Sequence, residues 1–279
     1  MKVDLSGRVA AVTGGGGVLC SRFAKALAES GAKVAVLNRT LAKAQKVVDE
    51  IKASGGEAAA IHVDVLDKES IIKAHEEMLS LYGKCDILIN GAGGNNPIAT
   101  CDEEFFSADT MLDPDRKSFF DLEEEGFQKV FGLNMVGVLL PTQVFARDMA
   151  EKGSGVIINI SSMNAFTPLT KIPAYSSAKA AVSNFTQWLA VYFAGSGIRC
   201  NAIAPGFFST EQNRTLLWNS DGSPTARTGK ILRSTPMGRF GEPEELLGTL
   251  LWLCDDSASG FVTGIVVPVD GGFSAYSGV

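Results

Sequence analysis

The chain has 279 residues, of which 46% are hydrophobic and 20% charged, and its formal net charge at pH 7 is −6. A composition this apolar excludes intrinsic disorder, and the acidic balance argues against nucleic acid as a partner. No uninterrupted apolar run approaches the roughly 20 residues of a membrane span, and residues 1–16 lack the apolar core of a signal peptide. We therefore expect a cytoplasmic protein without membrane partners.

Short apolar runs alternate with longer segments of helical periodicity along the chain. The predicted strands are Val9–Thr13, Lys33–Asn38, Ala58–Val63, Asp86–Asn90, Gly155–Ile160, Arg199–Ala204 and Ile265–Val269. The predicted helices are Ser21–Ser30, Leu41–Ser54, Lys68–Tyr82, Leu122–Lys152, Ala174–Ala194 and Pro243–Cys254. This alternation predicts a single α/β domain over residues 1–279, a Rossmann-type doubly wound fold with a seven-stranded parallel sheet and helices on both faces.

Two stretches interrupt the alternation, the acidic segment Asn95–Asp121 and the polar segment Phe207–Thr235. Each follows a predicted strand at its carboxyl end, which is the edge where such sheets bind ligands. Long loops in a compact domain are more often functional than idle. We therefore expect an insertion beside the substrate in the first segment and a substrate loop in the second.

The first predicted strand ends at Thr13 and runs into four glycines, Gly14, Gly15, Gly16 and Gly17. A glycine-rich turn between a strand and a helix lets backbone N–H groups approach a pyrophosphate at the positive end of the helix. The sequence therefore predicts a dinucleotide site at this turn.

The second predicted strand ends at Asn38, followed by Arg39. An acidic residue at the strand end would bind the ribose hydroxyls and repel a 2′-phosphate, and Asn38 removes that repulsion. The planar guanidinium of Arg39 can bind the phosphate through two hydrogen bonds. This favours NADP(H) as the cofactor, with NAD(H) as the alternative.

Tyr175 and Lys179 are four residues apart, which places them on one face of a helix, and Ser162 closes a predicted strand thirteen residues before Tyr175. A tyrosine with a pKa of about 10 is a poor acid–base catalyst at pH 7, but a neighbouring ammonium and an oxidised nicotinamide favour its phenolate. The Ser162 hydroxyl can hydrogen-bond the oxygen whose charge changes during hydride transfer. The spacing of the three residues predicts hydride transfer with Tyr175 as the acid/base. Because the chain has only two histidines and no C-x-x-C pair, we expect no metal site.

Taken together, the motifs resemble those of the short-chain dehydrogenase/reductase family over nearly the whole chain. The residues that carry the resemblance are Thr13, Gly14, Asp64, Val65, Asn90, Gly91, Ala92, Gly93, Asn134, Ser162, Tyr175, Lys179, Pro205, Gly206 and Thr210. The resemblance implies that Tyr175 is the general acid/base and that Lys179 holds the nicotinamide ribose and lowers the pKa of Tyr175. It also implies that Asn134 supports a water that relays protons to Lys179.

The same resemblance assigns the other cofactor contacts. Asp64 and Val65 would contact the adenine, and Asn90 would fix the central strand. The remaining contacts that it implies come from Gly91, Ala92 and Gly93, from Val18 and Leu19 in the glycine-rich turn, and from Pro205, Gly206, Phe208 and Thr210 near the nicotinamide. The family resemblance further implies a homotetramer. Two predicted long helices carry more large apolar side chains than one helix face readily buries, namely Phe127, Phe131, Phe145, Phe185, Trp188, Leu189 and Phe193.

Three positions depart from the family motifs. The pattern T-G-x-x-x-G-x-G would place glycines at Val18 and Cys20, and the pattern N-N-A-G would place an asparagine at Gly91. The glycine-rich loop must therefore differ locally from that of the family. The interval from Asn90 to Asn134 is also longer than is usual in the family, and the extra residues lie in Asn95–Asp121.

Within the family, four segments resemble most the members that interconvert D-mannonate and D-fructuronate: Ser161–Phe193, Asn201–Glu211, Pro224–Leu253 and Ser274–Val279. Polar side chains at the expected substrate mouth, Asn95, Asn164 and Arg214, suit a hydroxylated, anionic substrate that Ser162 also contacts. Arg214 is the first candidate to bind its carboxylate, and the alternatives are Lys171, Arg227 and Lys230. A keto or hydroxy sugar acid is therefore the expected small-molecule substrate. The alternatives are a gluconate 5-dehydrogenase-like activity, a 3-oxoacyl-thioester reductase and a non-catalytic dinucleotide-sensing module.

Overall fold

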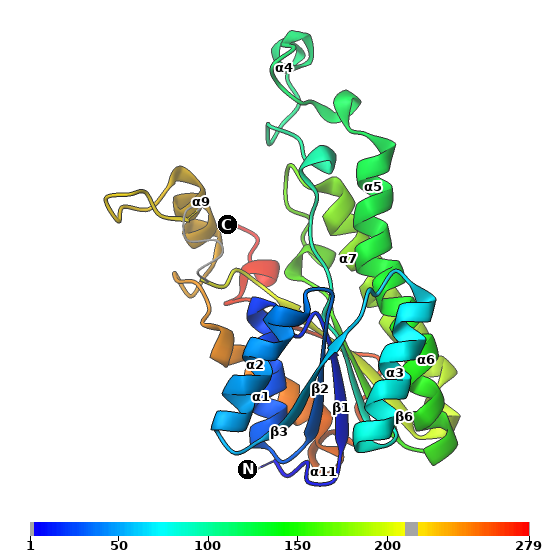
Figure 1. Cartoon of the computed structure of the whole chain (residues 1–279). Helices are drawn as coiled ribbons and strands as arrows, with labels where there is room; N and C mark the ends of the chain where they lie inside the picture. Colours follow the sequence, from blue (N-terminus) through cyan, green and yellow to red (C-terminus); the bar gives the residue numbers. More distant parts are fainter. Residues whose placement is uncertain (1–2, 210–216, 279) are drawn as a thin grey trace.

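The structure, a computed structural model, describes residues 3–209 and 217–278 (Figure 1). Seven strands form one parallel sheet in the order β3-β2-β1-β4-β5-β6-β7. Their bounds are β1 Val9–Thr13, β2 Lys33–Asn38, β3 Glu57–His62, β4 Ile87–Asn90, β5 Gly155–Ile160, β6 Ile198–Pro205 and β7 Val266–Val269. The order reverses between β1 and β4, so the ligand crevice of a doubly wound sheet is expected outside their carboxyl ends. The predicted fold class is confirmed.

The helices cover both faces of the sheet, which explains why its strands are apolar on both sides. On one face lie α1 (Val18–Glu29), α2 (Leu41–Ala53) and α10 (Leu247–Cys254), and they bury a core that includes Phe23 and Leu250. On the other lie α3 (Lys68–Tyr82), α6 (Gly137–Lys152) and α7 (Pro173–Tyr192), whose core includes Phe145 and Met149. The sheet is thus a rigid platform that fixes the positions of its strand ends.

Helix α1 begins three residues earlier than the sequence predicts. Gly17 is its N-cap, with φ −82° and ψ 167°, and Val18, Leu19 and Cys20 form its first turn. The two side chains that replace family glycines therefore stand on a helix rather than in a loop. This placement determines where the Cys20 thiol points.

The segment Leu122–Lys152, predicted as one helix, contains a π-helical turn. Helix α5 (Glu124–Phe131) passes through the π turn Gly132–Val136 into α6. Inside that turn the Asn134 Nδ2 donates a 2.8 Å hydrogen bond to the Val130 carbonyl oxygen, so a side chain satisfies a carbonyl within the bulge. Glu124–Lys152 has the length and mean hydropathy of a membrane span, but half of its most apolar window is buried inside the protein. It is a helix of the core.

Residues 95–121, here called the arm, extend beyond the carboxyl edge of the sheet (Figure 1). The arm contains two 3-10 turns, Pro97–Ala99 and Phe119–Asp121, and the short helix α4 (Ala108–Leu112). Its neck is closed by a pair of hydrogen bonds, from the Asp102 N–H to the Lys117 carbonyl (2.9 Å) and from the Lys117 N–H to the Asp102 carboxylate (2.6 Å). The acidic segment that interrupts the sequence pattern is thus a projection with its own short helix.

Several contacts tie the arm to the body of the protein. The Cys101 N–H donates to the Lys171 carbonyl at 2.7 Å, just before α7. The Lys230 Nζ lies 2.6 Å from a Glu104 carboxylate oxygen and comes from α9 (Ala226–Ser234) in the predicted substrate loop. The arm therefore joins the segments on both sides of the expected substrate mouth.

The last helix, α11 (Asp256–Ser259), lies far from this region, near the N-terminus (Figure 1).

Candidate active site and cofactor pocket

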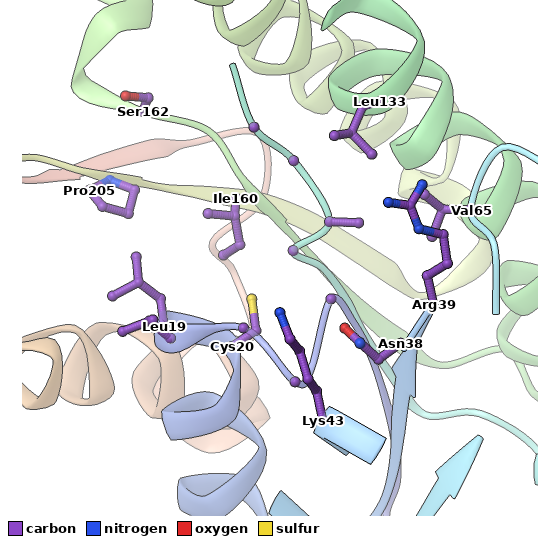
Figure 2. A pocket seen from close by; sticks show the side chains of 18 of the residues that line it. Leu19, Cys20, Asn38, Arg39, Lys43, Val65, Leu133, Ile160, Ser162 and Pro205 are labelled. Atoms are coloured by element: carbon purple, nitrogen blue, oxygen red, sulfur yellow. The ribbon is translucent and has the colours of Figure 1, made fainter. Parts of the chain in front are cut away.

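A cavity of about 590 Å³ follows the carboxyl edge of the sheet (Figure 2). The predicted residues that line it are Gly14, Gly16, Gly17, Val18, Leu19, Asn38, Arg39, Asp64, Val65, Gly91, Ala92, Gly93, Ser162, Tyr175, Lys179, Pro205 and Gly206. Lining residues that the sequence analysis missed include Cys20, Thr40, Lys43, Leu133 and Ile160. One continuous pocket thus joins the predicted adenosine end to the predicted catalytic side chains.

The glycine-rich turn has the shape that a pyrophosphate requires. Gly14 adopts φ +65°, and a β-carbon there would lie 3.0 Å from the Ala92 Cα, so a side chain would collide with the neighbouring strand end. Gly17 caps α1 without a side-chain hydrogen bond, which leaves backbone N–H groups of the first turn free for a ligand. The turn, the helix end and the length of the pocket together fit a dinucleotide.

At the adenosine end the pocket is bordered by two cations. Arg39 follows β2, Lys43 lies in the first turn of α2, and Figure 2 shows both side chains directed toward the pocket. Within residues 3–209 and 217–278 neither forms an ion pair, although Asn38 is fixed by a 2.9 Å hydrogen bond from its Nδ2 to the Thr40 carbonyl. The sequence offered one signal for Lys43, its position four residues after Arg39 at the start of a helix.

Ser162 and Tyr175 meet at the other end of the pocket. Ser162 ends the extended segment after β5 and caps the short turn Met163–Ala165, and Tyr175 stands in the first turn of α7. Burial raises the pKa of Tyr175 above its ordinary value, and the hydrogen bond with the Ser162 hydroxyl opposes this. The protein's own groups therefore favour the neutral phenol. The family resemblance implies that Lys179 lowers the pKa of Tyr175. The groups of the protein by themselves instead give a net rise.

Lys179 is buried beside Tyr175, with its Nζ 5.7 Å from the centre of the Tyr175 ring. The Nζ donates a 2.7 Å hydrogen bond to the Ile160 carbonyl at the end of β5. Burial lowers the pKa of Lys179 to about 8, because the charged form loses its hydration. The lysine is thus held in place by the sheet, and although its pKa is lowered it remains mostly protonated at pH 7.

Asn134 is fully buried and held by three hydrogen bonds. Its Nδ2 donates to the carbonyls of Gly94 (2.7 Å) and Val130, and its Oδ1 accepts from the Gly94 N–H (3.2 Å). A β-carbon at Gly93 would lie 2.7 Å from the Asn134 Oδ1 and 3.2 Å from the Lys179 Nζ. Only a glycine at position 93 leaves room between these two polar groups, as a proton relay would need.

Several predicted site residues lie outside the pocket. Thr13 and Asn90 tie strand ends together: the Thr13 Oγ1 accepts from the Gly91 N–H (3.0 Å), and the Asn90 Nδ2 donates to Asn159 on β5 (2.9 Å). Phe208 is buried against Gly241. Gly15 packs on Val36 of β2. These four residues support the framework around the pocket, and their cofactor contacts stay predictions.

The predicted substrate residues are more scattered. Asn95 is exposed and bonds Thr100, and Asn164 lines a separate cavity of about 610 Å³ between the arm and the start of α7. Thr210 and Arg214 lie outside the described residues. Of the alternative carboxylate ligands, Lys171 donates to the Asp102 carbonyl and Lys230 pairs with Glu104, so both cations are engaged by the arm. No cluster of three or more metal-binding side chains occurs in residues 3–209 and 217–278.

Comparison with known proteins agrees with this geometry. Residues 8–219 match the family model described as short chain dehydrogenase. The Bacillus subtilis protein named uncharacterized oxidoreductase UxuB is 56% identical over 276 residues, with 99% of this chain and 98% of that protein covered. A crystal structure from Haemophilus influenzae, named as a candidate D-mannonate oxidoreductase with bound NAD, is 59% identical with a TM-score of 0.95, covering 99% and 98% of the two chains.

A more distant structure, of a gluconate 5-dehydrogenase from Burkholderia cenocepacia with NADP and tartrate, is 30% identical with a TM-score of 0.83, covering 99% and 98% of the two chains. The family model alone covers well over half of this chain. The chain therefore belongs to the short-chain dehydrogenase/reductase family and is an NAD(P)-dependent oxidoreductase.

Proposed function

We propose that this enzyme transfers a hydride between NADP(H) and a keto or hydroxy sugar acid, with D-fructuronate and D-mannonate as the pair. The observation that carries the reaction type is the meeting of Ser162, Tyr175 and Lys179 at one end of a dinucleotide-shaped pocket. The substrate proposal is supported by full-length similarity to a structure named as a candidate D-mannonate oxidoreductase.

In the reducing direction, the nicotinamide supplies the hydride when the cofactor is bound. The carbonyl oxygen of the substrate accepts hydrogen bonds from the hydroxyls of Ser162 and Tyr175, and the Tyr175 phenol donates its proton to the oxygen as negative charge develops there. Since burial favours the neutral phenol, this proton is available at pH 7. Lys179 restores the proton to Tyr175, and Asn134 supports a water that relays protons to Lys179.

A substrate panel tests the proposal. NADPH oxidation is followed at 340 nm with D-fructuronate, 5-ketogluconate and a 3-oxoacyl thioester. We expect the highest kcat/KM with D-fructuronate and measurable D-mannonate oxidation in the reverse direction. A preference for 5-ketogluconate would instead support the gluconate 5-dehydrogenase-like activity, and a preference for the thioester would contradict a sugar-acid substrate.

The cofactor proposal, NADP(H) over NAD(H), rests on Arg39 and Lys43. Neither cation has an acidic partner among the described residues, and a 2′-phosphate would supply one. Arg39→Ala and Lys43→Met should each weaken NADPH binding about tenfold and leave NADH binding within about twofold, as one lost charged hydrogen bond predicts. Lys46→Met, an exposed lysine of the same helix that does not line this pocket, is the matched control. A parent enzyme that binds NADH more tightly than NADPH would overturn the preference.

We also propose the homotetramer. Phe145 and Leu189, two of the apolar side chains that suggested it, are buried within the subunit. Trp188 is more than half exposed and stacks on Tyr192, with ring centres 4.8 Å apart, so α7 presents an aromatic surface that a partner helix would cover. Light scattering at micromolar concentration should give a tetramer, and a monomer there would contradict the proposal.

A further inference from the structure

Two of the departures from the family motifs touch each other in the structure. Cys20 stands where the family has a glycine, and Gly91 stands where the family has an asparagine. A β-carbon at position 91 would overlap the Cys20 Sγ, and both residues line the cofactor pocket. Compared with the family motifs, this chain has a side chain in the first turn of α1 where the family has a glycine, and a glycine at the end of β4 where the family has a side chain.

The backbone conformation at position 91 does not require a glycine, but the atoms around it do. Gly91 is not among the glycines with positive φ, so its backbone conformation is open to other residues. Besides Sγ, a β-carbon there would meet the Thr13 carbonyl oxygen at 2.9 Å and the Cys20 Cβ at 3.5 Å. The first contact is closer than real β-carbons allow and involves a backbone atom, whereas the second is an ordinary van der Waals distance. The Cys20 sulfur is thus the largest obstacle to a side chain at position 91, and the Thr13 carbonyl oxygen is a second, smaller one.

The segment 91–93 carries this contact to the residues proposed to move the proton. At one end Gly91 rests on Cys20, and its N–H is held by the Thr13 Oγ1 at 3.0 Å. At the other end Gly93 leaves a gap bounded by the Asn134 Oδ1 and the Lys179 Nζ. The segment is thus packed between the thiol and the two relay side chains. Figure 2 shows the Cys20 sulfur directed toward the pocket, on the same side as Ile160, whose carbonyl binds Lys179.

We propose that Cys20 is a positioning residue: by filling the space beside Gly91, its side chain sets the position of segment 91–93 against Asn134 and Lys179. The thiol does no chemistry itself, since burial raises its pKa to about 12 and it remains neutral. Its proximity to Lys179 also helps to exclude water from that lysine. The inference rests on the proposed roles of Lys179 and Asn134.

A double-mutant cycle separates this role from general packing. The variants are Gly91→Ala, Cys20→Ala and the double variant. In the double variant the two β-carbons would lie at a permitted distance, and the close contact with the Thr13 carbonyl oxygen would remain. Gly248→Ala is the matched control, since a β-carbon there meets nothing within 4 Å and the residue does not line the cofactor pocket. Three quantities are measured for each: the thermal midpoint without cofactor, the Kd for NADPH, and the pH dependence of kcat/KM.

We expect Gly91→Ala to weaken NADPH binding at least tenfold. The double variant should bind NADPH at least about threefold more tightly than Gly91→Ala, although the contact with the Thr13 carbonyl oxygen keeps it weaker than the parent. Gly248→Ala should leave the Kd for NADPH within about twofold of the parent value. The limb of the pH profile assigned to Lys179, near pH 8 in the parent, should move to higher pH in Gly91→Ala as water reaches the lysine, and return in the double variant.

Additive effects of the two substitutions on binding and thermal midpoint would overturn the proposal. So would coupled effects with an unchanged pH limb, because they would reduce the pair to packing alone. Failure of the proposed chemistry is seen separately: Tyr175→Phe would then retain turnover, whereas the coupling in NADPH binding and thermal midpoint does not depend on turnover.

Discussion

The cofactor pocket and the arm lie at the same edge of the sheet, but their side chains are packed in opposite ways. In the pocket, Lys179 and Asn134 are 4% and 0% exposed, and every hydrogen bond of Asn134 is to the protein backbone. In the arm, Phe105 and Leu112 are 80% and 77% exposed. Its base is anchored by Ala99 in an apolar cluster with α5 and α7, but beyond that base the ties to the body are a few polar contacts. The chemistry is thus built into the rigid framework, and the arm is a loosely attached addition beside it.

This difference suggests a division of labour. The side chains that any carbonyl substrate would need come from the end of β5 and from α7, which packs on the sheet, so they cannot shift without disturbing the core. The arm contacts the segment before α7 through Lys171 and the substrate loop through Lys230, so it can alter the substrate mouth without disturbing the pocket floor. Lys171 is also the one non-glycine residue with positive φ (71°) among the described residues. Such strain is kept where a site needs it.

The largest expected effect comes from the rigid region. Tyr175→Phe should lower kcat at least about 10²-fold and leave the Kd for NADPH unchanged, because only the proton-donating hydroxyl is lost. Steady-state kinetics and fluorescence titration measure the two quantities. A variant with near-parental turnover would remove Tyr175 from the mechanism.

Replacing residues 103–116 with two glycines tests the loosely attached region. The Asp102–Lys117 pair closes the neck, so the fold should survive the replacement. We expect KM for the sugar acid to rise about tenfold and the Kd for NADPH to stay within about twofold, because no arm residue between these positions lines the cofactor pocket. An equal loss of cofactor binding would show that the two regions are not separable.

Removing the buried ammonium of Lys179 should lower activity but raise the stability of the fold. Its pKa in the folded protein, about 8, lies below the ordinary 10.5, so at pH 7 the fold must hold a poorly hydrated charge. Lys179→Met should abolish turnover yet raise the thermal midpoint at pH 7 by about 2–4 °C. Between pH 8 and 10.5 the unfolded chain binds more protons than the folded one, so the parent gains stability as pH rises. The gain of the variant should therefore shrink toward pH 10.5, and a constant difference would contradict this account.

The smallest effect belongs to the ion pair at the edge of the arm. Lys230 and Glu104 are both solvent-accessible, and Lys230 holds the pKa of Glu104 below its usual value. Glu104→Gln should change the thermal midpoint by less than about 2 °C, since exposed ion pairs contribute little. Its effect on KM should fall as salt is added. A large destabilisation would mean that the arm is more firmly integrated than its exposed phenylalanines indicate.

The sequence by itself determined the features that depend on local periodicity and on the order of elements. The alternation of apolar runs and helical segments predicted the seven-stranded sheet, because a parallel sheet covered on both faces needs strands that are apolar on both sides. The spacing of Tyr175 and Lys179 was informative because helical geometry puts residues four apart on one face. Arg39 was predictable because the end of the second strand borders the adenosine in this fold.

Only the tertiary structure decided the features that depend on contacts between segments distant in the chain. That Cys20 excludes a side chain at Gly91, 71 positions later, follows from the approach of α1 to the end of β4. The π turn at Asn134 depends on a side-chain bond to Val130 and on the backbone of Gly94 in another segment. Lys171 and Lys230 were candidates for the substrate carboxylate until the path of the arm brought Asp102 and Glu104 to them. Sequence patterns record which residue types are present and how they are spaced, but the partner of a side chain is set by how the elements pack together.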